Sequence, residues 1–392
     1  MSLSSHDLAH RARLFVGAAA LVAVAVPADA RVTYSLGLDA QALAASNPLL
    51  LQGDDLAALL VEGTLRPAMV ITDDTGATSV DLGGALTGRA YSRRYGQYLL
   101  GDAHADVSWR HSEHLLGTAR AEFRRDISAD TLTDSVDAAL DPRSTRNAFD
   151  AALGLTWAPT PRDTLTPNVQ YQRISYASSD VLGTTSVVTG DLAYNRRLNE
   201  RTSLGVRGAV ASSRARAGSE FLTYSLYGTL NRRLTPILRL TTDLGAEHSR
   251  EDRSSLPIGV RRSSRTSFSG RVGLCAEGTR MTGCVNGGVS TQISALGELQ
   301  RSYTASINAR RPIGTRQSLS LAADYQRAES NGSSARPIAI PPVSAASVRG
   351  AYDWRLAEHL TLSASLEYRR REFGSGRTAD GGTAGIMFRW QR

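Results

Sequence analysis

Strict alternation of apolar and hydrophilic residues runs through almost the whole chain and constrains its fold more than any other feature. In residues 359–371, for example, Leu360, Leu362 and Leu366 alternate with Thr361 and Glu367. A period of two residues is the signal of a β-strand with two different faces, whereas a helix needs a period of 3.6. The chain is therefore predicted to consist of strands that have one apolar and one hydrophilic face.

Eighteen segments carry this alternation, and each has room for the roughly 9–11 residues with which a tilted strand crosses a bilayer. We predict an all-β protein, a single transmembrane antiparallel up-and-down β-barrel of about eighteen strands over residues 31–392, with sixteen strands as the alternative. The predicted strands are 31–40, 57–72, 77–91, 97–110, 113–126, 146–158, 163–177, 185–197, 201–214, 219–233, 236–249, 264–276, 281–295, 300–312, 316–329, 344–356, 359–373 and 379–391.

The connections between these segments sort by length. Predicted turns such as 198–200 are short, whereas the four longest connections, 41–56, 127–145, 250–263 and 330–343, all fall on the opposite side of the barrel. Outer-membrane barrels have short periplasmic turns and longer external loops. We therefore predict that the long connections are external, that both termini are periplasmic, and that the 127–145 loop is the candidate plug of the lumen.

The alternative for alternating strands is a soluble β-sandwich, and the apolar face argues against it. A sandwich core is dense in large side chains, but here glycine and alanine interrupt the apolar face, which lipid tolerates. A closed barrel is also the only sheet whose backbone polar groups are all satisfied within lipid. Aromatic residues on the apolar phase near strand ends are predicted to form an interfacial belt: Trp157, Tyr171, Tyr194, Tyr325, Trp354, Tyr368 and Trp390.

Residues 1–30 are predicted to be a cleavable signal peptide. Arg11 and Arg13 precede an apolar stretch over residues 14–26, and Ala30 ends a small-residue cleavage site. The apolar stretch is shorter than the roughly 20 residues that a membrane-spanning helix needs. The leader predicts export through the inner membrane and a final location in the bacterial outer membrane.

The chain is basic, with 45 Lys and Arg residues, all of them Arg, against 37 Asp and Glu, and with a formal net charge of +8. The basic residues are not clustered, and an exported protein does not meet nucleic acid, so a nucleic-acid partner is not expected.

Two cysteines, Cys275 and Cys284, lie nine residues apart. A hairpin register that pairs Leu274 with Val285 places the two cysteines opposite each other on the lumen face. The oxidising periplasm permits a disulfide between them, with two free thiols as the alternative.

The carboxy-terminal segment 386–390 (IMFRW), together with the leader and the alternating strands, resembles Gram-negative outer-membrane β-barrel proteins of the porin type. This resemblance implies contact with outer-membrane lipid and lipopolysaccharide, and insertion by the barrel-assembly machinery. The terminal signal of that class usually ends on an aromatic residue, whereas here Gln391 and Arg392 follow Trp390.

A second resemblance, carried by residues 34–38 (YSLGL) and 47–51 (NPLLL), is to barrels that accompany exopolysaccharide gene clusters. It implies polysaccharide export components as partners. Eighteen strands with lumenal arginines are also similar to the architecture of the alginate export channel.

Arginines on the hydrophilic phase are the candidate determinants of pore selectivity. Rings of arginine favour anions, and a guanidinium group binds a carboxylate through two hydrogen bonds. The alternative is that they pair with lumenal acids such as Asp102, Glu122 and Asp191 and brace the barrel wall. The candidate arginines are Arg66, Arg89, Arg110, Arg120, Arg124, Arg207, Arg239, Arg271, Arg310, Arg349, Arg369 and Arg371, with Arg389 on the same phase.

A barrel enzyme is the competing class. His104 lies between Asp102 and Asp106 on one face of a predicted strand, but spacing places no Ser or Cys nucleophile beside it and no Gly-x-Ser-x-Gly motif occurs. Metal-ligand spacings and nucleotide-binding fingerprints are also missing, so neither a metal nor a cofactor is expected. The sequence predicts a non-enzymatic channel or conduit for anionic solutes or an acidic exopolysaccharide. The alternatives are a plugged barrel with a structural or surface-anchoring role, and a barrel hydrolase.

Overall fold

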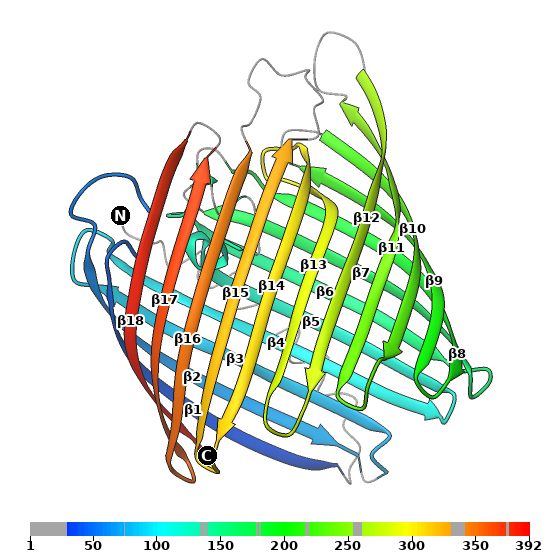
Figure 1. Ribbon diagram of the computed structural model, residues 1–392, viewed down its shortest axis with the longest axis horizontal. Coiled ribbons are helices and arrows are strands. Elements are labelled where there is room, and N and C mark those ends of the chain that lie inside the picture. The colour runs from blue at the N-terminus through cyan, green and yellow to red at the C-terminus, as the bar shows by residue number, and fades with distance from the viewer. Residues whose placement is uncertain are drawn as a thin grey trace.

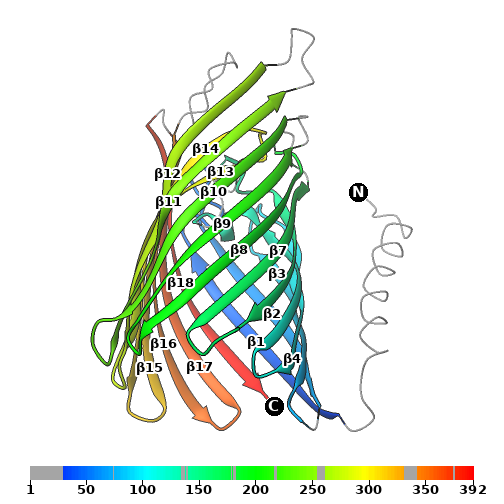
Figure 2. The ribbon, with the colours of Figure 1, turned by 90° about the vertical axis from the view of Figure 1, so that its right-hand side faces the viewer.

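The chain forms one closed barrel of eighteen antiparallel strands in the computed structural model (Figures 1 and 2). The structure describes residues 30–73, 75–133, 137, 140–177, 179, 182–215, 219–253, 261–330, 342–373 and 376–392. The predicted signal peptide, except Ala30, lies outside the described residues. In the part of the chain that is described, no helix has the length and apolarity that crossing a membrane requires.

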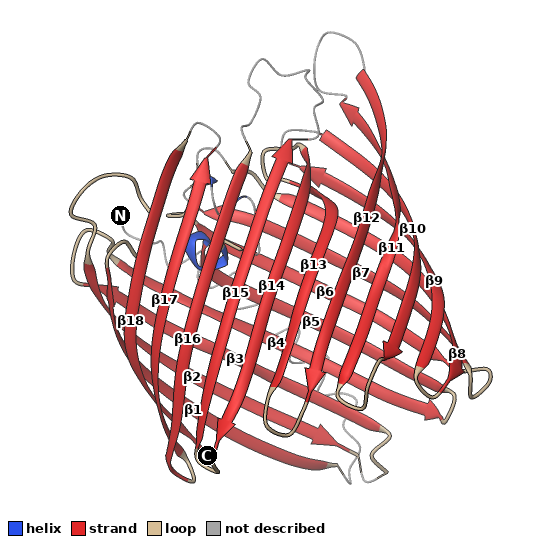
Figure 3. Cartoon of the chain, in the orientation of Figure 1, coloured by secondary structure: helices blue, strands red, loops and turns tan. Residues whose placement is uncertain are grey.

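Each strand pairs with its neighbour in the chain, and one short 3-10 helix, η1 (Ser128–Thr131), lies inside the barrel (Figure 3). The strands are β1 (Arg31–Ala45), β2 (Ala58–Thr72), β3 (Thr78–Tyr91), β4 (Gln97–Ser112), β5 (Leu115–Ile127), β6 (Thr145–Trp157), β7 (Asp163–Ala177), β8 (Thr185–Asn199), β9 (Thr202–Ala215), β10 (Ser219–Arg233), β11 (Leu238–Arg253), β12 (Arg261–Glu277), β13 (Thr282–Ile293), β14 (Leu299–Ile313), β15 (Gln317–Ser330), β16 (Val343–Ala357), β17 (Leu360–Phe373) and β18 (Arg377–Gln391).

The barrel closes where β1 pairs with β18, in a register that places Leu38 opposite Trp390. Asp39 on β1 forms ion pairs with both neighbouring strands at this seam: with Arg66 of β2 at 2.7 Å and with Arg389 of β18 at 3.1 Å. Because closure gives every strand two neighbours, the barrel has no open edge.

The structure confirms the predicted barrel with eighteen strands and excludes the alternative of sixteen. Strands β7 and β10 begin and end at the predicted residues. The largest shortening of a predicted loop is at 250–263, because β11 and β12 continue their register outward as far as the pair Arg253 and Arg261. The long connections 46–57 and 128–144 leave the barrel at one end, called here the outer end, and both termini of the barrel lie at the other, periplasmic end.

The outward face of the wall is apolar and open to its surroundings. Leu59, Leu153, Leu226 and Leu366 are between 61% and 68% exposed, values that a packed protein core does not allow. In a closed sheet of alternating faces, such residues define the surface that contacts lipid, and the hydrophilic phase then points into the lumen.

Candidate functional site

Two segments at the outer end fold into the lumen and take part in two clusters of buried apolar residues. Residues 46–57 place Leu49 and Leu51 against Ile127 and Ala129 at the start of the β5–β6 connection. Residues 128–133 place Leu132 against Leu50 and against residues of β16 and β18. We call residues 46–57 and 128–133 the inward segments. Residues 128–133 belong to the 127–145 loop, which the sequence predicted as the candidate plug. Residues 46–57 come from a second connection, which that prediction did not include.

Three lumenal arginines hold the inward segments. Arg89 on β3 forms ion pairs with Asp130 of η1 at 2.7 Å and with Glu62 of β2 at 2.8 Å. Arg369 on β17 donates hydrogen bonds to the carbonyl oxygens of Ala129 at 2.9 Å and Pro48 at 2.8 Å.

Arg371, also on β17, donates from its Nε to the carbonyl oxygen of Leu50 at 2.7 Å. The side chains of Arg89 and Arg369 are only 14% and 13% exposed, so water competes little for these bonds. We call Arg89, Arg369 and Arg371 the arginine clamp. Charge-assisted hydrogen bonds of this kind are roughly twice as strong as neutral ones.

Asp137 anchors the β5–β6 connection on the far side of the lumen. Its carboxylate accepts hydrogen bonds from the backbone N–H of Ala295 at 2.9 and 3.0 Å, and from the hydroxyl of Tyr176 at 3.3 Å. Burial raises the pKa of Asp137 to about 6, against the lowering effect of the Ala295 N–H. The connection therefore reaches from β5 to the turn between β13 and β14.

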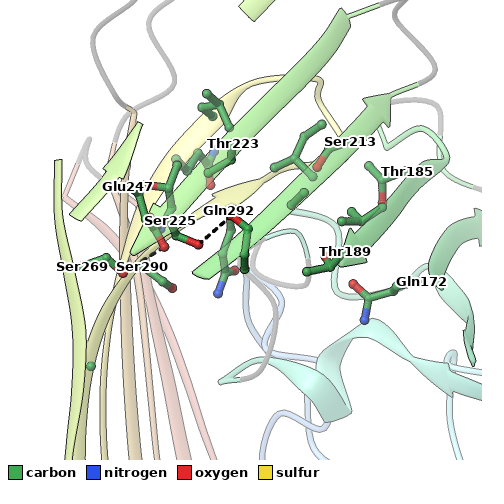
Figure 4. Close-up of a pocket in the computed structure, with 18 of the residues that line it drawn as sticks. Gln172, Thr185, Thr189, Ser213, Thr223, Ser225, Glu247, Ser269, Ser290 and Gln292 are labelled. Carbon is green, nitrogen blue, oxygen red and sulfur yellow. Dashed lines mark hydrogen bonds between the residues drawn. The ribbon is translucent and has the colours of Figure 1, made fainter. Parts of the chain in front are cut away.

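A polar cavity of about 740 Å³ lies in the lumen beside this connection, along strands β5 to β14 (Figure 4). Hydroxyl and amide side chains dominate its wall, including Gln172, Thr189, Ser213 and Gln292. Such groups both donate and accept hydrogen bonds. The cavity is therefore suited to solutes that carry several hydroxyl or amide groups.

Glu247 is a buried carboxylate in the wall of this cavity. It accepts hydrogen bonds from the hydroxyl of Tyr227 at 2.6 Å, from the hydroxyl of Ser269 at 2.9 Å and from the backbone N–H of Thr291 at 3.0 Å. The pairing between β12 and β13 ends at Gly270 and Val289. Beyond that pair, the carboxylate of Glu247 accepts the hydrogen bond of the Thr291 N–H in place of a backbone carbonyl of β12.

Charges in the cavity wall balance. Three of its arginines form ion pairs with acids: Arg124 with Glu122, Arg146 with Asp126 at 3.1 Å and Arg207 with Asp191 at 3.4 Å. Within the described residues, the side chain of Arg271 has neither a hydrogen bond nor an ion pair. The charged residues of the wall are Arg124, Arg146, Arg207 and Arg271 against Asp137, Asp150, Asp243 and Glu247.

The other candidate arginines are spread along the barrel wall rather than gathered in one ring. Arg120 pairs with Glu122 at 2.8 Å and Arg349 with Glu367 at 2.9 Å. Neutral acceptors hold two more, since Arg239 donates to Asn231 at 3.1 Å and Arg310 to Ser318 at 3.2 Å. Among the described contacts, the side chain of Arg110, near the periplasmic end of β4, has no partner. Most of the candidates thus form wall-bracing pairs, in line with the alternative to selectivity.

In the described part of the barrel, His104 makes no contact with the two acids that flank it in the sequence. Within the described chain, no hydrogen bond joins it to Asp102 or Asp106, and its nearest acid is Asp81 on β3, at 3.9 Å from Nε2. The imidazole lies over Gly83, where an added Cβ would come within 2.6 Å of the ring. No group of three His, Cys, Asp or Glu side chains suited to a metal occurs among the residues that the structure describes.

The predicted hairpin register is confirmed, with Leu274 opposite Val285 and Cys275 opposite Cys284. The structure joins the two cysteines in a disulfide. Both share the lumenal phase of Arg271 and lie next to the periplasmic turn between β12 and β13.

Sequence reasoning missed two parts of this site. Arg146 and Glu247 lie on the lumenal phase of their strands, which alternation alone would have revealed, but nothing local marks them as buried. Residues 46–57 carried a signal in the apolar run Leu49 to Leu51, which is unusual for an exposed loop.

The barrel, its lipid-facing exterior and its polar lumen together define an outer-membrane β-barrel protein. No protein-family model and no curated protein matches the sequence. The solved structures that are similar to this chain include two proteins of Acinetobacter baumannii and one of Pseudomonas aeruginosa.

OccAB3 of A. baumannii is 10% identical over 92% of this chain and 99% of that one, with a TM-score of 0.45. The outer membrane channel DcaP of A. baumannii is 12% identical over 93% of this chain and 98% of that one, with a TM-score of 0.47. The third is OccK5 (OpdH) from P. aeruginosa, with 11% identity over 92% of this chain and 98% of that one, at a TM-score of 0.47. The class of this protein rests on its own strand pairing and surface.

Proposed function

We propose that the protein is a channel through which small polar solutes cross the bacterial outer membrane. The observation that carries this proposal is the hydroxyl-rich and amide-rich cavity of about 740 Å³ inside a barrel whose exterior faces lipid. Barrels of 16–18 strands are wide enough to leave an aqueous lumen. A second lumenal space of about 430 Å³ lies at the periplasmic end and is lined by Arg310, Asp353 and Arg389.

The balanced charges of the outer cavity favour solutes of low net charge over strongly anionic ones. Three of its four arginines already have acid partners, so an anion would have to compete with Glu122, Asp126 or Asp191. A preference for anionic solutes would rest chiefly on Arg271 in this cavity and on Arg110 below it. Export of an acidic exopolysaccharide, with polysaccharide export components as partners, would further require the inward segments to leave the lumen.

A plugged barrel with a structural or surface-anchoring role is the second candidate, and the arginine clamp is the observation that favours it. Bonds from Arg89 on β3 and from Arg369 and Arg371 on β17 hold the inward segments to two separate strands of the wall. If these bonds never open, solute passage is restricted to the space beside the inward segments.

Planar-bilayer recording of the purified full-length barrel separates the two candidates. We expect discrete conductance steps from the native protein, and a reversal potential in a salt gradient that indicates weak ion selectivity. Liposome swelling with neutral sugars of increasing size then gives the size limit. The channel proposal fails if neither the native protein nor a variant with the clamp removed conducts. Strong anion selectivity would instead restore the arginine hypothesis.

A further inference from the structure

Arginines also project outward from the barrel, in a row near its outer end. Each lies next to an outward aromatic ring, either two residues away on the same strand or across one strand pair. On β14, for example, the guanidinium of Arg301 lies 5.6 Å from the ring centre of Tyr303, and that of Arg250 on β11 lies 6.0 Å from Tyr224 on β10. The pairs are Phe123 and Arg125, Tyr171 and Arg173, Tyr224 and Arg250, Tyr303 and Arg301, Tyr325 and Arg327, and Tyr368 and Arg370.

In every pair the arginine is the member closer to the outer end. On β7, which runs outward, Arg173 follows Tyr171, whereas on β14, which runs inward, Arg301 precedes Tyr303. Aromatic residues of barrel proteins lie at the membrane–water interface. The arginines therefore occupy the layer just outside it, where the headgroups of the outer leaflet lie and where a charge on the lipid face costs only about 0–1 kcal/mol.

The partners of these arginines differ around the barrel. Arg327 pairs with Glu329 at 2.7 Å and Arg370 with Glu372 at 3.7 Å, while Arg301 donates to the carbonyl oxygen of Phe268 at 3.1 Å. In the described part of the protein, Arg125 and Arg173 have no acid partner, and the Nε of Arg125 has no hydrogen-bond acceptor.

These two arginines lie on the same stretch of wall, separated by β6. Phe149 of β6 pairs with Phe123 of β5 on one side and with Arg173 of β7 on the other. The ring of Phe149 lies 6.1 Å from that of Tyr171. We call Arg125, Arg173, Phe149 and Tyr171 the β5–β7 patch. Arg173 is level with Phe123, two residues from Arg125 along the strand direction. Two strand spacings and this offset separate the two arginines by about 12 Å, and each guanidinium group can bind a phosphate through two hydrogen bonds.

We propose that the β5–β7 patch binds the phosphate groups of a phosphorylated glycolipid of the outer leaflet, with the acyl chains of that lipid lying over Phe149 and Tyr171. Charge complementarity and position carry the assignment. The patch has two cations without acid partners, it lies at headgroup height, and the apolar wall directly below it continues through Leu153. A soluble phosphate compound would gain only the arginine contacts and would leave the aromatic rings uncovered.

The test measures lipid binding to the intact barrel in detergent by native mass spectrometry, with bisphosphorylated lipid A and its dephosphorylated form as the two probes. We expect the native protein to bind the bisphosphorylated lipid at least tenfold more tightly than the dephosphorylated lipid. Equal binding of the two lipids by the native protein would overturn the proposal without any variant.

Two variants localise the site. Arg125→Gln combined with Arg173→Gln is expected to lose the preference for the bisphosphorylated lipid. Arg370→Gln is the matched control, because Arg370 has the same aromatic neighbourhood but an acid partner, and it is expected to change the affinity less than twofold. Unchanged binding in the double variant, or binding of inorganic phosphate as tightly as of the lipid, contradicts the assignment. Single-channel conductance of the double variant should equal that of the native protein, which separates this site from the lumen.

Discussion

Arg89 on the barrel wall forms an ion pair of 2.7 Å with Asp130 in the short 3-10 helix η1, and so fixes a segment inside the lumen to the wall. Asp130 is also 3.8 Å from Arg369 on β17. Because β18, β1 and β2 lie between β17 and β3 in the closed sheet, one carboxylate connects two stretches of wall that flank the closing seam. The width of the lumen at this level depends on whether those bonds are formed.

Removal of the arginine clamp is expected to widen the channel. Loss of one partner of a mostly buried ion pair costs about 3–5 kcal/mol, and each 1.4 kcal/mol changes an equilibrium about tenfold. Arg89→Gln combined with Arg369→Gln should therefore release the inward segments for most of the time and raise single-channel conductance at least about twofold. Arg349→Gln is the control, because Arg349 pairs only with Glu367 on the wall. Equal conductance of the two variants would show that the inward segments do not limit flow.

The docking of the β5–β6 connection is expected to weaken as the pH rises. Burial raises the pKa of Asp137 from its ordinary value of 3.8 to about 6, so the docked state binds the proton more tightly than the released state. The stabilisation is complete below about pH 4 and is lost as the pH rises through 6. Arg146 and the Tyr176 hydroxyl, which face Asp137, oppose this shift and keep part of the docking at neutral pH.

Conductance should accordingly be higher at pH 7.5 than at pH 4. Asp137→Asn keeps a neutral side chain at every pH, so its conductance should stay constant over the same range. A pH response of Asp137→Asn as large as that of the native protein would assign the effect to another group.

The strands were predictable because a two-faced strand in lipid has to alternate along its whole length. On β10, for example, the position of a residue in the alternation determines which face of the wall its side chain is on. Leu226 faces lipid, and the adjacent Ser225 faces the cavity. The closure of β1 on β18 followed from the even strand count and from the requirement that no edge remain unpaired in lipid.

The lumen was less predictable, because its contacts join residues far apart in the chain. Arg369 and Pro48 are bonded across 321 residues, and no local pattern indicates that these two groups meet. The lumenal arginines were recognisable by their phase in the alternation. Whether an arginine is neutralised, however, depends on whether an acid of a neighbouring strand lies beside it. Arg207 on β9, for example, lies beside Asp191 of β8 because of the register between these two strands. That ion pair neutralises the arginine, whereas the other candidate arginines are at least two strands away.

Loss of the disulfide is expected to destabilise the barrel modestly. Cys275 and Cys284 close a loop of only nine residues, for which the chain-entropy model gives about 2–3 kcal/mol. Cys275→Ser combined with Cys284→Ser should lower the urea concentration at the unfolding midpoint, as measured by the heat-modifiable mobility of the barrel on gels. Addition of reductant to the native protein should have the same effect and should leave the double variant unchanged.

Charge on the two faces of β10 is expected to have opposite consequences. Leu226, 66% exposed at the middle of the strand, faces the hydrocarbon, where an arginine costs about 2–4 kcal/mol at the bilayer midplane. Leu226→Arg should therefore lower the free energy of unfolding in lipid vesicles by that amount.

Ser225→Arg adds the same side chain one residue away but places it in the water-accessible cavity, so the free energy of unfolding of this variant should change by less than about 1 kcal/mol. Because the balanced lumen would gain one cation, opposite Glu247 of β11, Ser225→Arg should also shift the reversal potential toward anions. If both variants were equally destabilised, the assignment of lipid and lumen faces on this strand would be wrong.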